Sequence, residues 1–375
     1  MVDERSESAC GLRARDIGIA PGIFHPGAMN AITDVALVSV GHRTVIAGEG
    51  VRSGVTAILP HGGNLFQRKV PAGFACGNGY GKFAGSTQIA ELGEIETPIV
   101  LTNTLSVAEG IAGVVQWTLA QPGNEAVVSV NAVVGETNDG YLNDIRARQV
   151  TVPHVLDAIA SATNGPVAEG CVGAGTGTQA FGWKGGIGTS SRVLPAKCGA
   201  YAIGILVQTN YGGILTVAGR EIGQALGQFY LSEEKSEPRG DGSVVIIIAT
   251  DAPVSDRNLK RMAQRAFLGI ACTGSCMANG SGDYAIAFST HEAVRRDHEA
   301  DGETPSRPDL SNSAMSPLFQ AVKEATEEAV YNAMLQAHTV AGHLGRVLKR
   351  LEPSVLMALL DRSGFNENDP ETTPL

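Results

Sequence analysis

Residues 242–253 read GSVVIIIATDAP, and the apolar run inside this segment decides the fold. Six consecutive apolar residues follow Ser243, and most of them are β-branched. Such a run predicts a strand that is buried on both faces. The preceding residues, 232–242, read SEEKSEPRGDG and predict an exposed loop because they are polar and contain Pro and Gly. Ser243 is therefore expected at the border between solvent and core.

Strands and helices are expected on both sides of this central strand, without a strict β-α-β rhythm. Further strands are predicted where β-branched residues lie between Gly, Asn or Pro, at 35–40, 55–59, 99–101, 126–134, 202–207 and 283–289. Helices are predicted within 157–162 and 222–229, after the N-cap Ser255, and from the N-cap Ser316 with Pro317 at the first helical position. This mixture favours α+β layers over a doubly wound parallel sheet.

The composition is that of a globular protein. The 375 residues are 43% apolar and 18% charged, and the formal net charge is −10. No basic run stands out, so no nucleic-acid partner is expected. The charged N-terminus lacks the apolar segment of a secretory signal, and no apolar run is long enough for a membrane span. We expect a cytoplasmic enzyme without a membrane partner, whose six cysteines are reduced core thiols.

The local signatures of several other enzyme classes are incomplete or absent in the sequence. The segment 173–178, GAGTGT, lacks the third glycine of a dinucleotide-binding loop because Thr178 stands there. The sequence contains no HExxH zinc-protease motif and no GxSxG nucleophile elbow. None of the eight histidines carries a local catalytic signature.

The junction between Gly242 and Ser243 is the candidate for chemistry. A serine hydroxyl is a poor nucleophile without a base. An α-amine can be that base, because its ordinary pKa of about 7.7–8.0 lies close to the working pH. Cleavage before Ser243 would create such an amine on the residue that carries the hydroxyl. Gly242 has no side chain to block attack on its carbonyl. On these residues alone, an ordinary serine at a loop-to-strand turn stays the alternative.

Seven segments in order carry a resemblance to a known family. They read PGAMNAITDVALVSVGHRT (26–44), GNGYGKFAGSTQI (77–89), GETNDGYLNDIRAR (135–148), VGAGTGTQAFGWKGGIGTSSR (172–192), VQTNYG (207–212), GSVVIIIATDAP (242–253) and SGDYAIAFST (281–290). On these segments the chain resembles the L-aminopeptidase/D-esterase family, also called the DmpA-type or β-aminopeptidase family.

The resemblance implies a fold and a maturation route. The fold is a four-layer α/β/β/α sandwich, shared with the ornithine acetyltransferases. Residues 1–375 would form one domain, made as an inactive precursor that cleaves itself at the Gly242–Ser243 bond. The products would be an α chain of residues 1–242 and a β chain of residues 243–375, which stay associated as αβ units of a homotetramer. No metal or organic cofactor is implied.

The resemblance also assigns roles around the cleavage site. Ser243 would be the nucleophile and its freed α-amine the general base. Ser281 and Asp283 match the Ser-Gly-acidic motif of the family, so they would hydrogen-bond around this amine. A carboxylate in that position favours the ammonium form and raises the pKa of the amine.

Three further residues are implied for the substrate. Asn210, in VQTNYG, would donate its amide NH2 to the oxyanion, an interaction typically worth about 3 kcal/mol. Tyr141 would line the active site, and Glu136 is a candidate to hold the ammonium group of the substrate. The expected activity is removal of N-terminal residues from small peptides, amides or esters.

Two alternatives stay open at the level of sequence. One is acyl transfer of the ornithine acetyltransferase type, which uses a threonine. Thr250 follows Ala249 but stands at the end of the predicted strand and is followed by Asp251. The other is a non-catalytic protein that binds a small molecule in the Gly-rich pocket.

Overall fold

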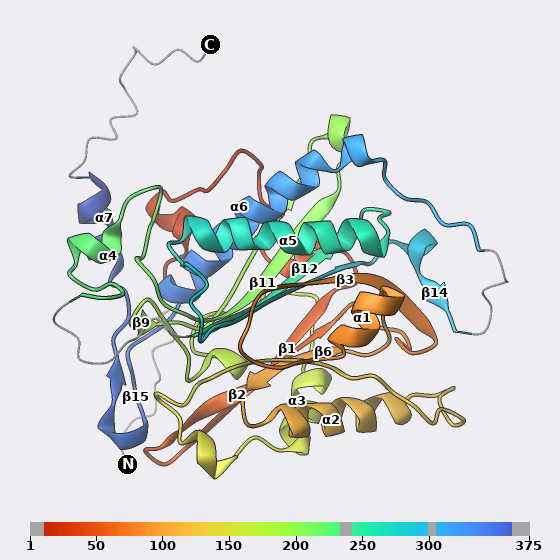
Figure 1. Ribbon diagram of the computed structural model, residues 1–375, viewed down its shortest axis with the longest axis horizontal. Helices are drawn as coiled ribbons and strands as arrows, with labels where there is room; N and C mark the ends of the chain where they lie inside the picture. Colours follow the sequence, from red (N-terminus) through yellow and green to blue (C-terminus); the bar gives the residue numbers. More distant parts are fainter. Residues whose placement is uncertain (1–10, 233–241, 299–304, 362–375) are drawn as a thin grey trace.

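The computed structural model describes residues 11–232, 242–298 and 305–361. Two mixed sheets pack face to face, and helices cover the outer face of each (Figure 1). The predicted four-layer α/β/β/α sandwich is confirmed. The loop predicted at 232–242 falls almost wholly outside the described residues.

The first sheet has the strand order β1-β2-β6-β7-β4. Helices α2 and α3 lie on its outer face, where Val55, Val100 and Val134 pack against Val114 and Val155. The elements of this half are β1 (Ser39–Ala47), β2 (Val51–Leu59), β4 (Phe83–Ala84), β6 (Ile99–Asn103), β7 (Val133–Thr137), α2 (Val107–Leu119) and α3 (Val152–Ala160).

The second sheet has the order β10-β11-β12-β13-β3-β14, with β5 beside β3. Helices α5 and α6 cover its outer face. The elements of this half are β3 (Arg68–Gly79), β5 (Glu94–Ile95), β10 (Ile187–Val193), β11 (Ala202–Asn210), β12 (Ser243–Thr250), β13 (Gly282–Ser289), β14 (Arg296–Asp297), α5 (Asp256–Cys272) and α6 (Ser316–Leu335).

Smaller elements complete the described chain. They are α1 (Ser86–Leu92), α4 (Ile222–Ala225), α7 (Pro353–Asp361), and two short hairpins made of β8 (Gln179–Ala180) with β9 (Trp183–Lys184) and of β15 (Val340–Ala341) with β16 (Val347–Leu348). No helix among the described residues has the length and apolar character needed to cross a bilayer.

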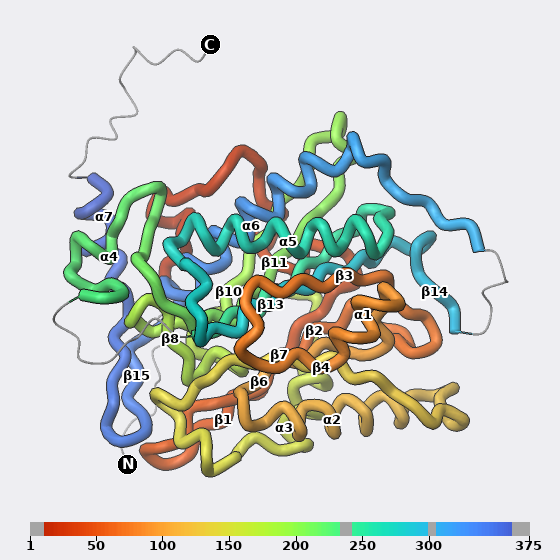
Figure 2. The backbone as a smooth tube through the Cα atoms, in the orientation of Figure 1, coloured from red at the N-terminus to blue at the C-terminus, as the bar shows by residue number. Residues whose placement is uncertain are grey.

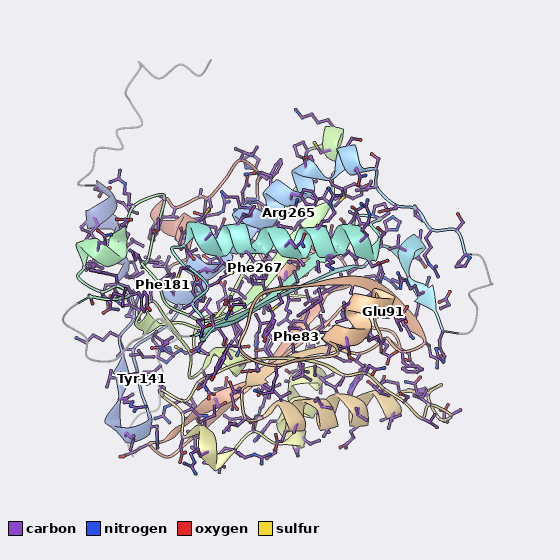
Figure 3. All side chains as sticks on the ribbon, in the orientation of Figure 1. Phe83, Glu91, Tyr141, Phe181, Arg265 and Phe267 are labelled. Carbon is purple, nitrogen blue, oxygen red and sulfur yellow. The ribbon has the colours of Figure 1, made fainter. Side chains whose placement is uncertain are left out.

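Strand β12 is buried along its whole length, as its sequence predicts. Val244, Ile246 and Ile248 pack into the core beneath α5 and α6. Val245 and Ile247 face the first sheet and join the core between the sheets. Phe83 of β4 lies in that same central layer (Figure 3). The alternation follows from the two-residue repeat of a strand and places β12 at the centre of the molecule.

Segments from both sides of Gly242 share the second sheet. Strand β12 pairs with β11 in the antiparallel direction and with β13 in the parallel direction, and β13 pairs in turn with β3. Figure 2 shows the early strand β3 lying next to the late strand β13. The two chains expected from cleavage would therefore remain hydrogen-bonded within one sheet.

A buried ion cluster also links the two segments. Arg192 of β10 pairs with Glu328 of α6 at 2.8 Å and with Glu324 at 3.4 Å, and all three side chains are fully buried. Arg15 binds Glu328 from the other side at 2.9 Å. Removal of one partner from such a cluster leaves an uncompensated buried charge, so these pairs favour the joined state of the two segments.

Several element boundaries differ from the sequence prediction. The strand predicted at 35–40 begins only at Ser39, because Leu37 adopts a left-handed conformation with φ of 77°. The strand predicted at 126–134 begins only at Val133, since the preceding segment lies on the surface and Val128 is 99% exposed. The helix predicted within 222–229 is the single turn Ile222–Ala225.

The helix predictions in the C-terminal half of the chain agree more closely with the structure. Ser255 caps α5 by accepting a hydrogen bond from the Asn258 backbone. Ser316, predicted as an N-cap, is instead the first helical residue, and Met315 takes the cap position. The apolar stripe of α5 is buried at Leu259, Met262, Ala263, Ala266 and Ile270. Phe267 belongs to the same stripe but is half-buried.

The prediction of buried cysteines was wrong for two of the five described thiols. Cys76 and Cys276 are exposed, whereas Cys171, Cys198 and Cys272 are half-buried. All five are free. Cys76 lies near the end of β3, where the strand leaves the core.

Candidate active site

Ser243 is the first residue of β12 and sits between two backbone neighbours. In the sheet it is opposite Asn210 of β11 and opposite Gly282 of β13. Its exposed fraction is only 7%. The register thus brings three segments that are far apart in the sequence to one point at the end of the second sheet.

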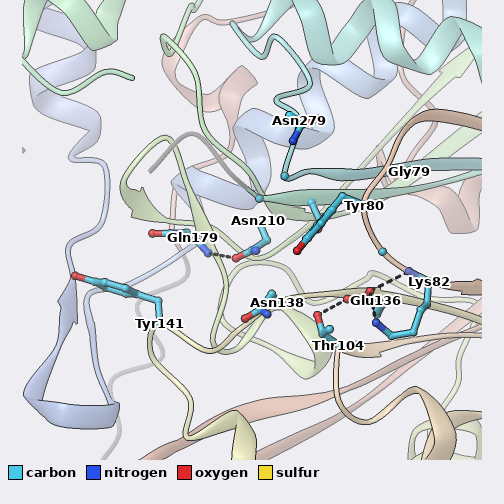
Figure 4. A pocket seen from close by; sticks show the side chains of 14 residues that line it. Gly79, Tyr80, Lys82, Thr104, Glu136, Asn138, Tyr141, Gln179, Asn210 and Asn279 are labelled. Atoms are coloured by element: carbon cyan, nitrogen blue, oxygen red, sulfur yellow. Dashed lines mark hydrogen bonds and ion pairs between the residues drawn. The ribbon is translucent and has the colours of Figure 1, made fainter. Parts of the chain in front are cut away.

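A cavity of about 800 Å³ opens at this end of the sheet (Figure 4). Five of the predicted site residues line it, namely Gly242, Ser243, Asn210, Glu136 and Tyr141. Its size suits a small organic ligand. Ser281 and Asp283, the other predicted residues, do not belong to its lining and lie behind Ser243 in the sheet. The remaining lining residues are Gly79, Tyr80, Gly81, Lys82, Thr104, Asn138, Gln179, Asn279 and Gly280.

The backbone N–H of Gly282 points at the bond that the sequence marks for cleavage. It donates to the Gly242 carbonyl oxygen at 3.1 Å and lies 3.3 Å from Ser243 Oγ. This donor was missed by sequence reasoning, because the strand register alone brings the amide of Gly282 to this place. Gly282 itself stands in the Ser-Gly-acidic motif, which was the available signal.

Gly242 is held so tightly that no side chain fits there. A Cβ atom at this position would lie 2.2 Å from the Asn210 carbonyl oxygen and 2.5 Å from the Tyr211 Cα. The contacts are with backbone, so a small shift of a flexible side chain cannot relieve them. The glycine before the serine is thus required by the close approach of β11.

The amide of Asn210 has a fixed orientation. Its Oδ1 accepts a hydrogen bond of 3.1 Å from the Gln179 backbone N–H (Figure 4). Because a backbone N–H can only donate, the oxygen must take this side and the NH2 group must take the other. The NH2 group is therefore available to an oxyanion at the end of the sheet.

Asp283 is a buried carboxyl group on the opposite side of the sheet from the Ser243 hydroxyl. It accepts a hydrogen bond of 2.7 Å from Ser281 Oγ at Oδ1, whereas Oδ2 is buried and makes no hydrogen bond within the described chain. Burial raises the pKa of Asp283 to about 6, against the lowering effect of the hydrogen bonds from Ser281 and the Val244 backbone. The carboxyl group neighbours the backbone of β12.

Glu136, at the end of β7, is buried in the cavity wall. The Lys82 backbone N–H donates to its Oε1 at 3.1 Å, and Lys82 Nζ lies 3.3 Å from the same oxygen (Figure 4). The Thr104 hydroxyl donates to Oε2. Sequence reasoning identified Glu136 but missed these two partners. Lys82 lies in the recognised GNGYGK segment, whereas Thr104 had no local signal.

Tyr141 forms the outer edge of the cavity. The Arg346 guanidinium lies over its ring at 5.0 Å from the ring centre. In Figure 4 the ring lies well to one side of Asn210, and its hydroxyl points away from that residue. The structure therefore brings the Tyr141 ring to the wall and directs its hydroxyl elsewhere.

Thr250, the residue of the acyltransferase alternative, lies at the far end of β12 from the cavity. It is fully buried, and its hydroxyl donates to the Ala202 carbonyl oxygen at 2.9 Å. This hydrogen bond holds the end of β12 to the start of β11, and the position of Thr250 does not favour a role as the nucleophile of an acyltransferase.

Known proteins resemble this chain over most of its length. Residues 30–348 match Peptidase family S58. The beta-peptidyl aminopeptidase BapA of Sphingosinicella microcystinivorans is 41% identical over 377 residues, which cover 95% of this chain and 93% of that protein.

Solved structures also resemble this chain in fold and in sequence. The PH0078 protein from Pyrococcus horikoshii OT3 matches with a TM-score of 0.87 and 45% identity, covering 94% of this chain and 99% of that one. The L-aminopeptidase D-Ala-esterase/amidase from Ochrobactrum anthropi, described as a prototype for the serine aminopeptidases and a variant of the Ntn hydrolase fold, matches with a TM-score of 0.86 and 35% identity over 94% of this chain and 99% of that one. The chain therefore belongs to peptidase family S58 and is an N-terminal-nucleophile serine aminopeptidase.

Proposed function

We propose that the chain cleaves itself between Gly242 and Ser243 and then uses Ser243 to release N-terminal residues from small peptides, amides or esters. One observation carries this proposal. The Gly282 N–H donates to the Gly242 carbonyl oxygen at 3.1 Å while Ser243 Oγ lies 3.3 Å from the same nitrogen. The nucleophile, the bond to be cut and an oxyanion donor thus occupy one point.

Self-cleavage begins with attack of Ser243 Oγ on the Gly242 carbonyl carbon. The negative charge that develops on the Gly242 oxygen is stabilised by the Gly282 N–H, which already contacts that oxygen. Collapse breaks the peptide C–N bond, the departing nitrogen takes up the proton that the hydroxyl lost, and an ester between Gly242 and Ser243 remains. Water hydrolyses the ester, which yields the Gly242 carboxylate and a Ser243 that carries both a free hydroxyl and a free α-amine.

Turnover uses both groups of Ser243. The α-amine takes the hydroxyl proton as Oγ attacks the carbonyl carbon of the N-terminal residue of the substrate. The Asn210 NH2 group donates to the oxyanion, since its Oδ1 is held by Gln179. The leaving amine then takes the proton from the Ser243 ammonium, and water releases the acyl group.

Asp283 and Ser281 tune the new amine. Cleavage creates an ammonium one residue before Val244, which is the ladder partner of Asp283. The buried Oδ2 of Asp283 has its hydrogen-bonding capacity unused in the described chain, so it suits this ammonium. Their attraction favours the charged amine and the ionised carboxylate together.

Glu136 and Tyr141 shape the substrate end of the cavity. We assign to Glu136 the ammonium group of the substrate, because it is a carboxylate in the wall of a cavity that also holds Ser243. The Tyr141 ring limits the outer edge. These assignments fit an exopeptidase, which must recognise a free N-terminus.

We propose β-amino acyl compounds as the preferred substrates, since relatives at 41% and 40% identity are named beta-peptidyl aminopeptidases. The p-nitroanilides of β-homo-residues, L-Ala and D-Ala test this choice, with Ser243→Ala as the blank. The highest kcat/KM for a β-homo-residue supports the proposal. A higher value for either α-alanine compound overturns the preference and leaves the nucleophile assignment intact.

We also propose that the α and β chains stay together in a cytoplasmic homotetramer of αβ units. The shared second sheet and the Arg192 ion cluster support the association of the two chains. Mass measurement by light scattering tests the assembly. A mass four times that of one αβ unit is expected, and the mass of a single unit contradicts it.

A further inference from the structure

Cys171, Lys184 and His338 form a cluster of ionisable side chains that the proposed mechanism does not use. Lys184 of β9 is fully buried, and its Nζ donates to the Gly175 carbonyl at 2.9 Å and to the Gly185 carbonyl at 2.8 Å. The Lys184 ammonium also lies close enough to the Cys171 thiol for the two groups to interact electrostatically. Carbonyl oxygens bear no formal charge, so a nearby thiolate stabilises the buried ammonium.

His338 contacts Cys171 from the segment after α6. The Cys171 thiol donates to the His338 carbonyl oxygen at 3.6 Å, and the His338 imidazole lies close enough to interact with the same sulfur. Two other charged groups face the cluster, namely Asp139 toward Lys184 and Arg350 toward His338. The sulfur is thus placed between an ammonium and an imidazole.

These neighbours govern the ionisation of the thiol. Burial acts to raise the pKa of Cys171, but the Lys184 ammonium and the interactions with His338 outweigh it and lower the pKa to about 7. The interaction with the Cys171 sulfur in turn raises the pKa of His338. Cys171 is half-buried, so small reagents can reach it.

The cluster lies behind the wall of the substrate cavity. Cys171 and Tyr141 both pack against the small apolar core of Leu142, Val340 and Leu348. On the other side, Lys184 is the ladder partner of Gln179.

Gln179 connects the cluster to the proposed oxyanion donor. Its backbone N–H fixes the Asn210 amide at 3.1 Å. A change at Cys171 therefore acts on two parts of the active site, the Tyr141 edge and the Asn210 orientation.

We propose that Cys171 is a covalent modification site, at which Lys184 and His338 hold a reactive thiolate for small electrophiles and peroxides, and that its oxidation lowers the activity of the adjacent site. In the peroxide reaction the thiolate attacks one peroxide oxygen and the O–O bond breaks. Sulfur is oxidised by two electrons to the sulfenic acid, and the departing hydroxide takes up a proton as water. The modification claim is independent of the proposed function, whereas the effect on activity rests on it.

The first test compares cysteines within the same protein. Iodoacetamide labelling, resolved by mass spectrometry across pH 5–9, gives a rate for each thiol. Exposed Cys76 is the internal control, because burial and the Asp283 carboxylate raise the pKa of its thiol. At pH 6.5, Cys171 should react at least about tenfold faster than Cys76, since its larger thiolate fraction outweighs its lower intrinsic nucleophilicity. Equal rates, or slower labelling of Cys171, would overturn the proposal.

Two variants test whether the neighbouring charges, rather than exposure alone, make the Cys171 thiol reactive. Lys184→Met should move the pH midpoint of Cys171 labelling upward by removing the ammonium. His338→Leu, at an exposed position, should move it in the same direction and keeps the test valid if the buried variant fails to fold. A midpoint unchanged in His338→Leu and in folded Lys184→Met would contradict the role of the cluster.

The link to activity needs its own measurement. Hydrogen peroxide should reduce turnover of the wild type, dithiothreitol should restore it, and Cys171→Ala should resist the treatment. Equal inhibition of the wild type and Cys171→Ala would refute the link. A wild type that forms the sulfenic acid, detected with dimedone, but keeps full turnover would refute it too.

Discussion

Asn210 and Ser243 face each other directly in the antiparallel ladder between β11 and β12. The strand register fixes this relationship, and the Gln179 N–H fixes the direction of the Asn210 amide. An oxyanion donor is therefore placed beside the nucleophile before any substrate binds, which is the condition for electrostatic stabilisation without reorganisation.

Asn210→Ala should reduce kcat by about 10²–10³-fold with a smaller effect on KM, because the donor acts on charge that develops in the transition state. Steady-state kinetics on a p-nitroanilide measure both values. Asn138→Ala, which also changes an asparagine of the cavity wall, is the matched control and should have a minor effect on kcat. A loss in kcat below tenfold for Asn210→Ala would remove this residue from the mechanism.

Gly242→Ala should block or strongly slow self-cleavage. The new Cβ would lie 2.2 Å from the Asn210 carbonyl oxygen, so β11 or the bond to be cut must move. Overpacking of this kind costs typically about 1–3 kcal/mol. Gly62→Ala is the control, because a Cβ there meets nothing within 4 Å. The fraction of cleaved chain on a denaturing gel after expression gives the answer, and wild-type cleavage of Gly242→Ala would contradict the geometry.

The Asp283 carboxyl should make the uncleaved protein less stable as the pH rises. Its pKa is raised by burial to about 6, so the folded chain keeps a proton that the unfolded chain releases from about pH 4 upward. The stabilisation is complete below pH 4 and is lost as the pH passes through 6, amounting to about 2–3 kcal/mol.

Urea unfolding of Ser243→Ala, which should stay uncleaved, measures this effect at pH 4.5 and 7.5. Other buried carboxyls with raised pKa values, such as Asp139 and Glu169, contribute in the same direction. The difference between Ser243→Ala and Ser243→Ala with Asp283→Asn isolates Asp283. An identical pH dependence of the two proteins would show that Asp283 keeps an ordinary pKa.

Arg192→Met should destabilise the protein by about 3–5 kcal/mol, because Glu324 would keep a buried charge without its ionic partner and Glu328 would keep only Arg15. Adding Glu328→Met should recover part of this loss by removing one of those charges. Urea unfolding measures both variants, and gel filtration reports whether the cleaved chains still elute together. If Arg192→Met alone were as stable as the variant that also carries Glu328→Met, the cluster would not hold α6 to β10.

The central strand of the fold was predictable because burial leaves a direct mark on sequence, whereas the four-layer order followed from the family resemblance. The run from Val244 to Ala249 is apolar at every position and mostly β-branched, as expected of a strand buried on both faces. Residues 126–132 show the limit of this signal. They include β-branched side chains but lie outside the sheet, where Val128 is almost completely exposed. Local propensity cannot tell whether a neighbouring strand is present.

The site was predictable only as far as its side chains carry motifs. Ser243, Asn210 and Glu136 were identified within recognisable segments and line one cavity. The Gly282 N–H was not, because backbone donors acquire their positions from strand register. Cys171 was predicted only as a core thiol and Lys184 had no local signal, because the folding of the chain between them brings the two residues together.

The most direct test is the mass of the purified wild-type protein beside that of Ser243→Ala. The wild type should contain two fragments, one ending at Gly242 and one beginning with Ser243, and Ser243→Ala should stay as one inactive chain near 38.9 kDa. A wild type that hydrolyses substrate as a single intact chain, or a Ser243→Ala protein that is cleaved and active, would contradict the account.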